Sequence, residues 1–424
     1  MRIRKDESGQ MLVMTALSLL LLMGFLALAI DVGVLFRAQR NMQIAADAAA
    51  VAAALNNQYS ATTNPTAAAD AAALANGVAS TYVTVNNPPA SGWHTGVGYI
   101  EVIVNQPNPT YFMSLFGINP VNVAARAVAG IVPSPSCIYV LNPTSSGTSF
   151  WVKGGAKGGP SINAAGCGIQ VDSSSQNAFC DQGSATVNAP YIHIVGYQSP
   201  TGQCNKQPTG GAPVTTSGTS IPDPYNNLAG PTDPSQCSQT SSATNLANTS
   251  IVANGGTYCF TNMSAGVTLN NVSLTGGTFV FMNGVSLSGT VTVTNGTFDV
   301  EQGQFTQGNA ALNITAPTTG TYNSIAFMVP WTNSVTTCGS SGKSVGINYP
   351  PTCVQLQFGS GGFGSLDGII YAPTSTVWMQ DSGGGVQAAG IVAFNLFNNS
   401  QIDITSYNQQ HPSTTPLSTV SMVE

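Results

Sequence analysis

One apolar stretch near the start of the chain constrains this sequence more than any other feature. It runs from Met11 to Ile30, reads MLVMTALSLLLLMGFLALAI and contains no charged residue. At the helical rise of about 1.5 Å per residue it extends about 30 Å, the thickness of a bilayer's hydrocarbon core. We therefore predict a transmembrane helix over residues 11–30. Because Arg2, Arg4 and Lys5 precede it, we expect a cytoplasmic amino terminus and export of the rest of the chain.

A cleaved secretory signal is the alternative for this stretch. Such a signal has an apolar run of about 7–15 residues and a cleavage site of small residues. The run here is longer, and residues 31–37 (DVGVLFR) follow it without an A-x-A pattern. We therefore expect a retained, single-pass anchor, with the bulk of the chain on the other side of the membrane from the amino terminus.

The low charge of the chain indicates a β-rich protein. Only 6% of its residues are charged, against about 25% in typical soluble domains. Disordered chains are rich in charge and poor in aromatic residues, whereas this chain is 8% aromatic and has recurring β-branched runs. Five of its ten basic residues lie in the first forty positions, so no basic patch remains for nucleic acid.

All eight cysteines follow the apolar span, and an even number in an exported chain predicts disulfides. Pairing of sequence neighbours gives Cys137–Cys167, Cys180–Cys204, Cys237–Cys259 and Cys338–Cys353. Eight cysteines nevertheless allow about 105 pairings, so the connectivity stays open. Only the last pair has further support, because the turn at Pro350-Pro351 can fold that segment back on itself. The chain has three histidines and no C-x-x-C, so we expect neither a metal nor a cofactor.

The helical pattern continues beyond the span to about residue 55. Residues 34–55 contain neither proline nor glycine and are dominated by alanine, the strongest helix former. We therefore predict one helix of about 45 residues over the anchor and its extension, within a first region of residues 1–55. The extension has an apolar face of small side chains, formed by Leu35, Met42, Ala46, Ala49 and Ala53. This face packs either on the domain that follows or on copies or relatives of the chain.

The sequence of residues 56–133 predicts a small α+β domain. Asn64-Pro65 is a helix start, with the asparagine as cap and the proline at the first helical position. Strand patterns follow at residues 80–85, 98–104 and 121–132, with a helical turn at residues 110–116 that Gly117 ends.

Residues 134–408 predict a β-rich region with internal repetition. Gly-Thr-aromatic recurs at residues 256–258, 277–279, 296–298 and 320–322; Val-Ser-Leu recurs at 272–274 and 285–287; residues 368–373 have an echo at 390–395. Periods near 20 residues with glycine or asparagine at corners favour a parallel β-solenoid. An antiparallel β-sandwich is the alternative. We expect long, disulfide-stapled surface loops at residues 177–249 and a flexible tail at residues 409–424.

The carboxylates are the candidate catalytic residues, because β-helical enzymes that cleave carbohydrates work with pairs of Asp or Glu. Asp299 and Glu301 lie two apart on one predicted strand, and Asp367 and Asp381 could face each other one coil apart. The simpler interpretation of Asp299 and Glu301 is that both are solvated residues of a strand. Trp151, Trp331 and Trp378 either line a sugar-binding surface or pack in the core.

Three segments near the amino terminus carry a family resemblance: residues 7–10 (ESGQ), 29–33 (AIDVG) and 40–54 (RNMQIAADAAAVAAA). In this order they resemble the amino-terminal domain of TadG-like proteins of the Flp (tight adherence, Tad) pilus assembly system. The resemblance implies a membrane-anchored, pilin-like envelope protein in pilus assembly or adhesion, whose partners are lipid, other pilin-like proteins and an inner-membrane platform. A processed prepilin carries Glu five residues after the cleavage glycine, where this chain has Met14, so a permanent anchor fits better.

Four residues are our candidates for an assembly contact: Asp31, Gly33, Gln43 and Asp47. The alternative for Asp31 is an interfacial charge that ends the span. Asp47 is expected to be exposed, with Gln43 four residues before it and within hydrogen-bonding reach on a helix.

The leading hypothesis is therefore a non-enzymatic, single-pass envelope protein that acts in Flp-type pilus assembly or surface adhesion. We expect its anchor in the inner membrane and the bulk of the chain in the periplasm or outside the cell. A membrane-tethered β-helical protein that binds or cleaves surface polysaccharide is the alternative, and a passive cell-wall scaffold is a third.

Overall fold

The computed structural model describes residues 8–59, 64–133, 136–143, 147–153, 162–182, 185–198, 213–216, 220, 223–225, 228, 230, 234–262, 264–329, 354–359, 363–380, 386–404 and 418–424. The chain divides into two compact units. Unit 1 comprises residues 1–132 and 419–424, and unit 2 comprises residues 133–418.

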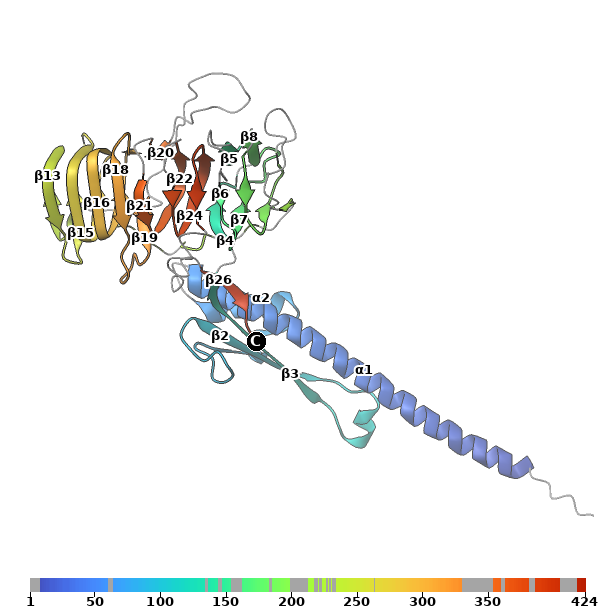
Figure 1. Ribbon diagram of the computed structural model, residues 1–424. Coiled ribbons are helices and arrows are strands. Elements are labelled where there is room, and N and C mark those ends of the chain that lie inside the picture. The colour runs from blue at the N-terminus through green and yellow to red at the C-terminus, as the bar shows by residue number, and fades with distance from the viewer. Residues whose placement is uncertain are drawn as a thin grey trace, which may run out of the picture. The chain divides into compact units, whose positions relative to one another are not determined.

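Unit 1 is built on one continuous helix, α1 (Ser8–Tyr59), of 52 residues (Figure 1). Its first half exposes the large apolar side chains of residues 11–30 and is long and apolar enough to cross a membrane. Its second half is covered, because Ala46, Ala49 and Ala53 are fully buried in a core shared with helix α2 and strand β2. The small apolar face predicted for this helix thus packs on its own unit.

The predicted α+β elements of unit 1 are present. Asn64 caps α2 (Pro65–Ala75) by accepting a hydrogen bond from the Ala67 N–H at 3.0 Å. Strands β1 (Val83–Asn86), β2 (Tyr99–Asn108) and β3 (Val121–Pro133) pair antiparallel. Two short 3₁₀ helices, η1 (Ser80–Tyr82) and η2 (Met113–Phe116), complete it, so residues 80–82 are not strand as predicted.

The expectation of a flexible tail over residues 409–424 is wrong for its last part. Strand β26 (Ser418–Met422) follows β3 in the sheet of unit 1. The Val128 N–H donates to the Glu424 carbonyl at 2.8 Å, and the Val423 N–H donates to the Val128 carbonyl at 2.9 Å. The chain's end therefore completes the sheet; residues 409–417 lie outside the described residues.

Unit 2 consists of parallel strands. An 18-stranded sheet contains β4 (Ser136–Val140), β5 (Phe150–Lys153), β7 (Gly168–Val171), β8 (Phe179–Gln182), β10 (Ile192–Ile194), β11 (Val214–Thr215), β12 (Gln239–Ser241), β13 (Asn245–Val252), β14 (Thr257–Phe260), β15 (Val267–Phe281), β16 (Val285–Val300), β17 (Phe305–Thr306), β18 (Ala311–Thr315), β19 (Ile325–Met328), β20 (Val354–Phe358), β21 (Phe363–Asp367), β22 (Ile369–Met379) and β24 (Gly390–Asn398). A smaller sheet contains β6 (Ile162–Asn163), β9 (Val187–Asn188), β23 (Val386–Gln387) and β25 (Ile402–Asp403). The pairings described for both sheets are parallel, which an antiparallel sandwich does not provide.

The first three copies of the Gly-Thr-aromatic repeat lie in register on strands β14, β15 and β16. Tyr258 lies opposite Phe279, and Phe279 lies opposite Phe298. Inside the stack the rings of Phe260, Phe281 and Phe298 follow one another at centroid distances of 4.6 and 4.8 Å. The repeat therefore marks equivalent positions on successive strands and lines them with aromatic core residues.

The first strands of unit 2 pair with its last. Strand β4 lies between β24 and β7, so the chain enters the sheet in its interior (Figure 1). Strands β8 to β12 fall within residues 177–249, where we expected long surface loops, so that expectation is wrong for the residues in these short strands. Short strands flanked by proline and glycine gave too weak a pattern to recognise.

Two predicted disulfides are present, Cys137–Cys167 and Cys237–Cys259. Cys180 is also disulfide-bonded. Its predicted partner Cys204, and the predicted pair Cys338–Cys353, lie outside the described residues.

Candidate functional site on the long helix

Asp31 lies one residue beyond the apolar span and is fully buried. Its Oδ1 accepts a hydrogen bond from the Tyr111 N–H at 2.9 Å, and its Oδ2 accepts from Phe112 at 2.9 Å and from Met113 at 2.6 Å. These donors lead into η2, so the carboxylate caps the turn that connects β2 and β3. Asp31 therefore joins two segments of its own unit.

Gln43 connects α1 with strand β3. Its Nε2 donates to Asp47 Oδ1 at 2.7 Å, the pair that their spacing predicts, and to the Arg126 carbonyl at 3.1 Å. One turn earlier, Gln39 Nε2 donates to the Ala124 carbonyl at 2.9 Å. Asp47 is half-buried rather than exposed as expected, since the helix face that carries it approaches the sheet.

Gly33 has a different character from these three residues. A Cβ placed on it would meet no atom within 4 Å beyond its chain neighbours and the nearby backbone of its own helix. The packing of this chain alone therefore does not require glycine here, and the absent side chain leaves room for another backbone. An assembly contact through Asp31, Gly33, Gln43 and Asp47 remains a prediction.

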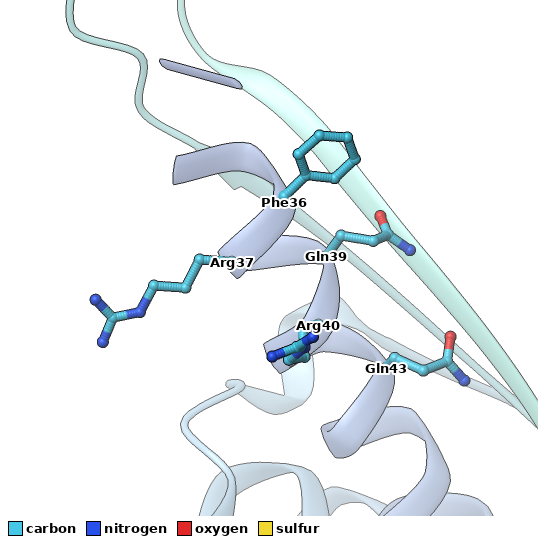
Figure 2. A pocket seen from close by; sticks show the side chains of 5 residues that line it. All are labelled: Phe36, Arg37, Gln39, Arg40 and Gln43. Carbon is cyan, nitrogen blue, oxygen red and sulfur yellow. The ribbon is translucent and has the colours of Figure 1, made fainter. Parts of the chain in front are cut away.

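A pocket opens along the same stretch of α1. Phe36, Arg37, Gln39, Arg40 and Gln43 line it. In Figure 2 the two glutamines point toward the neighbouring strand, and Arg37 points away from it. Among the described residues, neither Arg37 nor Arg40 forms an ion pair, so both guanidinium groups are available to an acidic group.

A charged cluster lies further along β3. Arg126 bridges Glu101 and Glu424, and Asn86 Nδ2 donates to Glu101 Oε2 at 2.6 Å. Burial raises the pKa of the Glu101 carboxyl, whereas the hydrogen bonds from Asn86, Arg126 and the Ala90 N–H lower it. The hydrogen bonds outweigh burial, so the pKa of Glu101 lies below its ordinary value. The cluster ties β2 and β3 to the end of the chain.

The carboxyl pair considered for catalysis is not solvated. Asp299 is 0% exposed and Glu301 is 5% exposed, so the interpretation as solvated strand residues is wrong. Burial raises the pKa of Asp299 well above its ordinary value, and the adjacent Glu301 raises it further. Both causes favour the protonated form of the Asp299 carboxyl. Asp367 is half-buried, and Asp381 lies outside the described residues.

Two of the tryptophans proposed for sugar binding, Trp151 and Trp378, are packed in the interior. Trp151 is 3% exposed and Trp378 is 9% exposed, and both contact Phe397 in one buried cluster. Neither offers an open ring face on which a sugar could stack. Trp331 lies outside the described residues.

Unit 2 contains a buried carboxylate, Asp223, whose contact with Tyr371 no local pattern in the sequence indicates. The Tyr371 hydroxyl donates to Asp223 Oδ2 at 2.8 Å across a sequence separation of 148 residues. Burial raises the pKa of Asp223 to about 6, although the bonds from the Tyr225 N–H and Tyr371 lower it. Among the described residues, no group of three or more His, Cys, Asp or Glu side chains could hold a metal ion.

Comparison with known families gives one match. Residues 9–58 match the family described as putative Flp pilus-assembly TadE/G-like. The match covers most of α1, including Asp31, Gly33, Gln43 and Asp47. No curated protein and no solved structure matches the chain.

Proposed function

Because residues 9–58 are TadE/G-like, we propose that this chain is a membrane-anchored, TadG-like envelope protein of the Flp (Tad) pilus system, acting in pilus assembly or surface adhesion. Residues 11–30 cross the inner membrane once, the amino terminus is cytoplasmic, and both units beyond the span face the periplasm or the exterior. In this proposal the protein is not an enzyme.

The single observation that carries this proposal is the change of character along α1. The residues from Met11 to Ile30 expose large apolar side chains, whereas Ala45 to Ala54 are largely buried against α2 and the sheet. Exposed apolar surface of this extent is stable only in lipid or against a partner. A helix whose first half exposes apolar side chains and whose second half packs against its own domain is the arrangement expected of a pilin-like anchor.

Unit 2 acts in this proposal as a parallel β-solenoid presented on the outer side. In its favour, Tyr258, Phe279 and Phe298 occupy equivalent ladder positions, 21 and 19 residues apart. Stacked parallel strands of this kind make long, regular surfaces suited to contact. The oxidised pairs Cys137–Cys167 and Cys237–Cys259 suit an oxidising compartment.

Other Tad components are the proposed protein partners, and the open face of α1 is the proposed contact. Gly33 leaves space there, and Arg37 and Arg40 form no ion pair within the described part of the chain. Gly33→Leu adds a side chain at a position where a Cβ meets no neighbouring element of this chain within 4 Å. We expect it to reduce pilus number in cells that keep normal amounts of the protein.

Thr66→Leu, at an exposed position of α2, is the matched control and should leave pili unchanged. Equal pilus numbers in Gly33→Leu and wild-type cells would remove this face from the proposal. Electron microscopy of pili and quantification of the protein in membranes provide the two readouts.

The alternative, a polysaccharide-binding or polysaccharide-cleaving protein, is tested with the purified full chain. The buried positions of Asp299 and Glu301 argue against cleavage, because a polymer cannot reach them. Release of sugar from surface polysaccharide that is lost on Asp299→Asn would replace the assembly proposal with the enzymatic one.

A further inference from the structure

The connection between β2 and β3, residues 109–120 and here named the tip loop, exposes an unusual amount of apolar surface. Its exposed large side chains are Tyr111 (63%), Phe112 (40%), Leu115 (80%), Phe116 (83%) and Ile118 (47%). No charged residue occurs between Glu101 and Arg126. Apolar groups gathered in this way on a loop mark a surface that another apolar phase covers.

The tip loop is fixed beside the end of the membrane span. The three hydrogen bonds from Tyr111, Phe112 and Met113 to the Asp31 carboxylate hold its backbone one residue beyond Ile30. From there the β2–β3 hairpin runs along α1, as Figure 1 shows. Gln39 contacts Ala124, and Gln43 contacts Arg126. The hairpin therefore points its tip toward the apolar half of the helix.

The apolar surface of the span continues on the helix beside this loop. Ile30, Val32 and Phe36 are 43%, 37% and 71% exposed. Arg37 and Arg40 lie about 10 and 15 Å beyond Ile30 along the helix axis, where long side chains can reach back toward phosphate headgroups. The polar layer on each side of a bilayer is about 5–8 Å deep, so Asp31 and the tip loop fall within it.

We propose that the tip loop inserts its aromatic and aliphatic side chains into the interfacial layer of the same bilayer that α1 spans. The occupant of this surface is lipid. Aromatic side chains favour this depth, and a second contact beside the helix fixes its tilt and rotation. This inference rests on the proposed membrane anchor, and it adds a second membrane-binding element to it.

Asp31 is the positioning residue of this arrangement. A carboxylate at the edge of a hydrocarbon phase is costly unless its charge is compensated, and three backbone N–H groups supply that compensation. The same bonds set the loop's depth. Loss of the carboxylate is therefore expected to release the loop while the span stays in place.

The test uses the full chain in vesicles of phosphatidylethanolamine and phosphatidylglycerol, with photoreactive benzoylphenylalanine at one position at a time. Phe25→benzoylphenylalanine probes the span, and Phe116→benzoylphenylalanine probes the tip loop. Trp93→benzoylphenylalanine is the control, because Trp93 is 93% exposed. The Trp93 N–H donates a hydrogen bond to Glu424, and Glu424 forms an ion pair with Arg126. The Arg126 carbonyl in turn accepts a hydrogen bond from Gln43, so these contacts connect Trp93 to the part of α1 around Gln43. Gln43 lies about 18 Å along the helix from Asp31.

Lipid adducts at Phe25 and Phe116, with none at Trp93, are the expected result. Lipid adducts at Phe25 together with protein adducts or none at Phe116 overturn this inference and leave the anchor intact. Absence of lipid adducts at Phe25 overturns the anchor itself. The two failures are thus distinguishable in one experiment.

Asp31→Ala in the same chain supplies the second readout. We expect a several-fold loss of lipid adduct at Phe116 and unchanged adduct at Phe25. An unchanged yield at Phe116 contradicts the positioning role of the carboxylate.

Discussion

The two units of this chain bury their cores with side chains of opposite size. In unit 1, Ala46, Ala49 and Ala73 are completely buried, and the small side chains let α1 and α2 approach closely. In unit 2 the core is filled by stacked rings such as Phe281 and Phe298. Unit 1 should therefore be sensitive to added volume and unit 2 to removed volume.

The largest expected effect comes from removing a stacked ring of unit 2. Phe281→Ala takes away a fully buried side chain between Phe260 and Phe298 and should lower the stability of this unit by about 3–5 kcal/mol. Denaturant unfolding of the full chain in detergent should shift only the transition of unit 2. Val252→Ala, at a position 49% exposed, is the control and should cost under about 1 kcal/mol. Equal losses in the two variants would break the comparison.

The next largest effect is that of disulfide reduction, which should destabilise unit 2 and leave the stability of unit 1 unchanged. Residues 1–132 and 419–424 contain no cysteine, so unit 1 should not respond to a reductant. The bond Cys237–Cys259 closes a separation of 22 residues, and its loss in the Cys237→Ala, Cys259→Ala double variant should cost unit 2 about 3 kcal/mol. A reductant that shifts the transition of unit 1 would contradict this assignment.

Added volume should damage unit 1. Ala73 is fully buried on α2, so Ala73→Leu should lower the stability of this unit by about 1–3 kcal/mol. Ala71→Leu, at an exposed position of the same helix, should change it little, since leucine is also a good helix former. Thermal unfolding followed by circular dichroism compares the pair, and a loss that is the same in both would show that the alanine packing is loose.

The smallest effect is electrostatic and confined to unit 1. The pKa of Glu101 is lowered below 4.5 in the folded state, so its stabilising contribution is present above about pH 4.5 and disappears as the pH falls through the folded value. Glu101→Gln should cost about 2 kcal/mol at pH 7, and the difference from wild type should narrow by pH 3. A difference independent of pH would exclude the ion pair as its source.

The repeats in the sequence predicted part of unit 2 correctly and part of it wrongly. Gly-Thr-aromatic placed Tyr258, Phe279 and Phe298 in register. Its fourth copy ends at Tyr322, but Phe327 is the residue opposite Phe298. A motif that is equally compatible with a strand and with a turn does not determine which one forms.

The two copies of the Val-Ser-Leu repeat do not pair with each other, for a related reason. Val285 pairs with Val267, and Val272 pairs with Val291. Alternation of inward and outward residues fits any strand of a parallel stack, so it gives the facing of a strand but not its partner. Ile370 pairs with Ile391, one residue away from the offset that the sequence echo indicates.

Local spacing predicted part of the candidate site, and distance in sequence concealed the rest. Gln43 and Asp47 are four residues apart on one helix, so their bond was predictable. The partners of Asp31 lie about 80 residues away and are backbone N–H groups, which any residue except proline provides. The pairing of β26 with β3 likewise joins two segments that lie far apart in the sequence.

Fractionation of cells that express the full chain tests the central claim most directly. The account predicts that the chain stays with membranes after alkaline carbonate extraction and that its thiols resist alkylation until a reductant is added. Recovery of the intact chain in the soluble cytosolic fraction, with thiols that react before reduction, would contradict it.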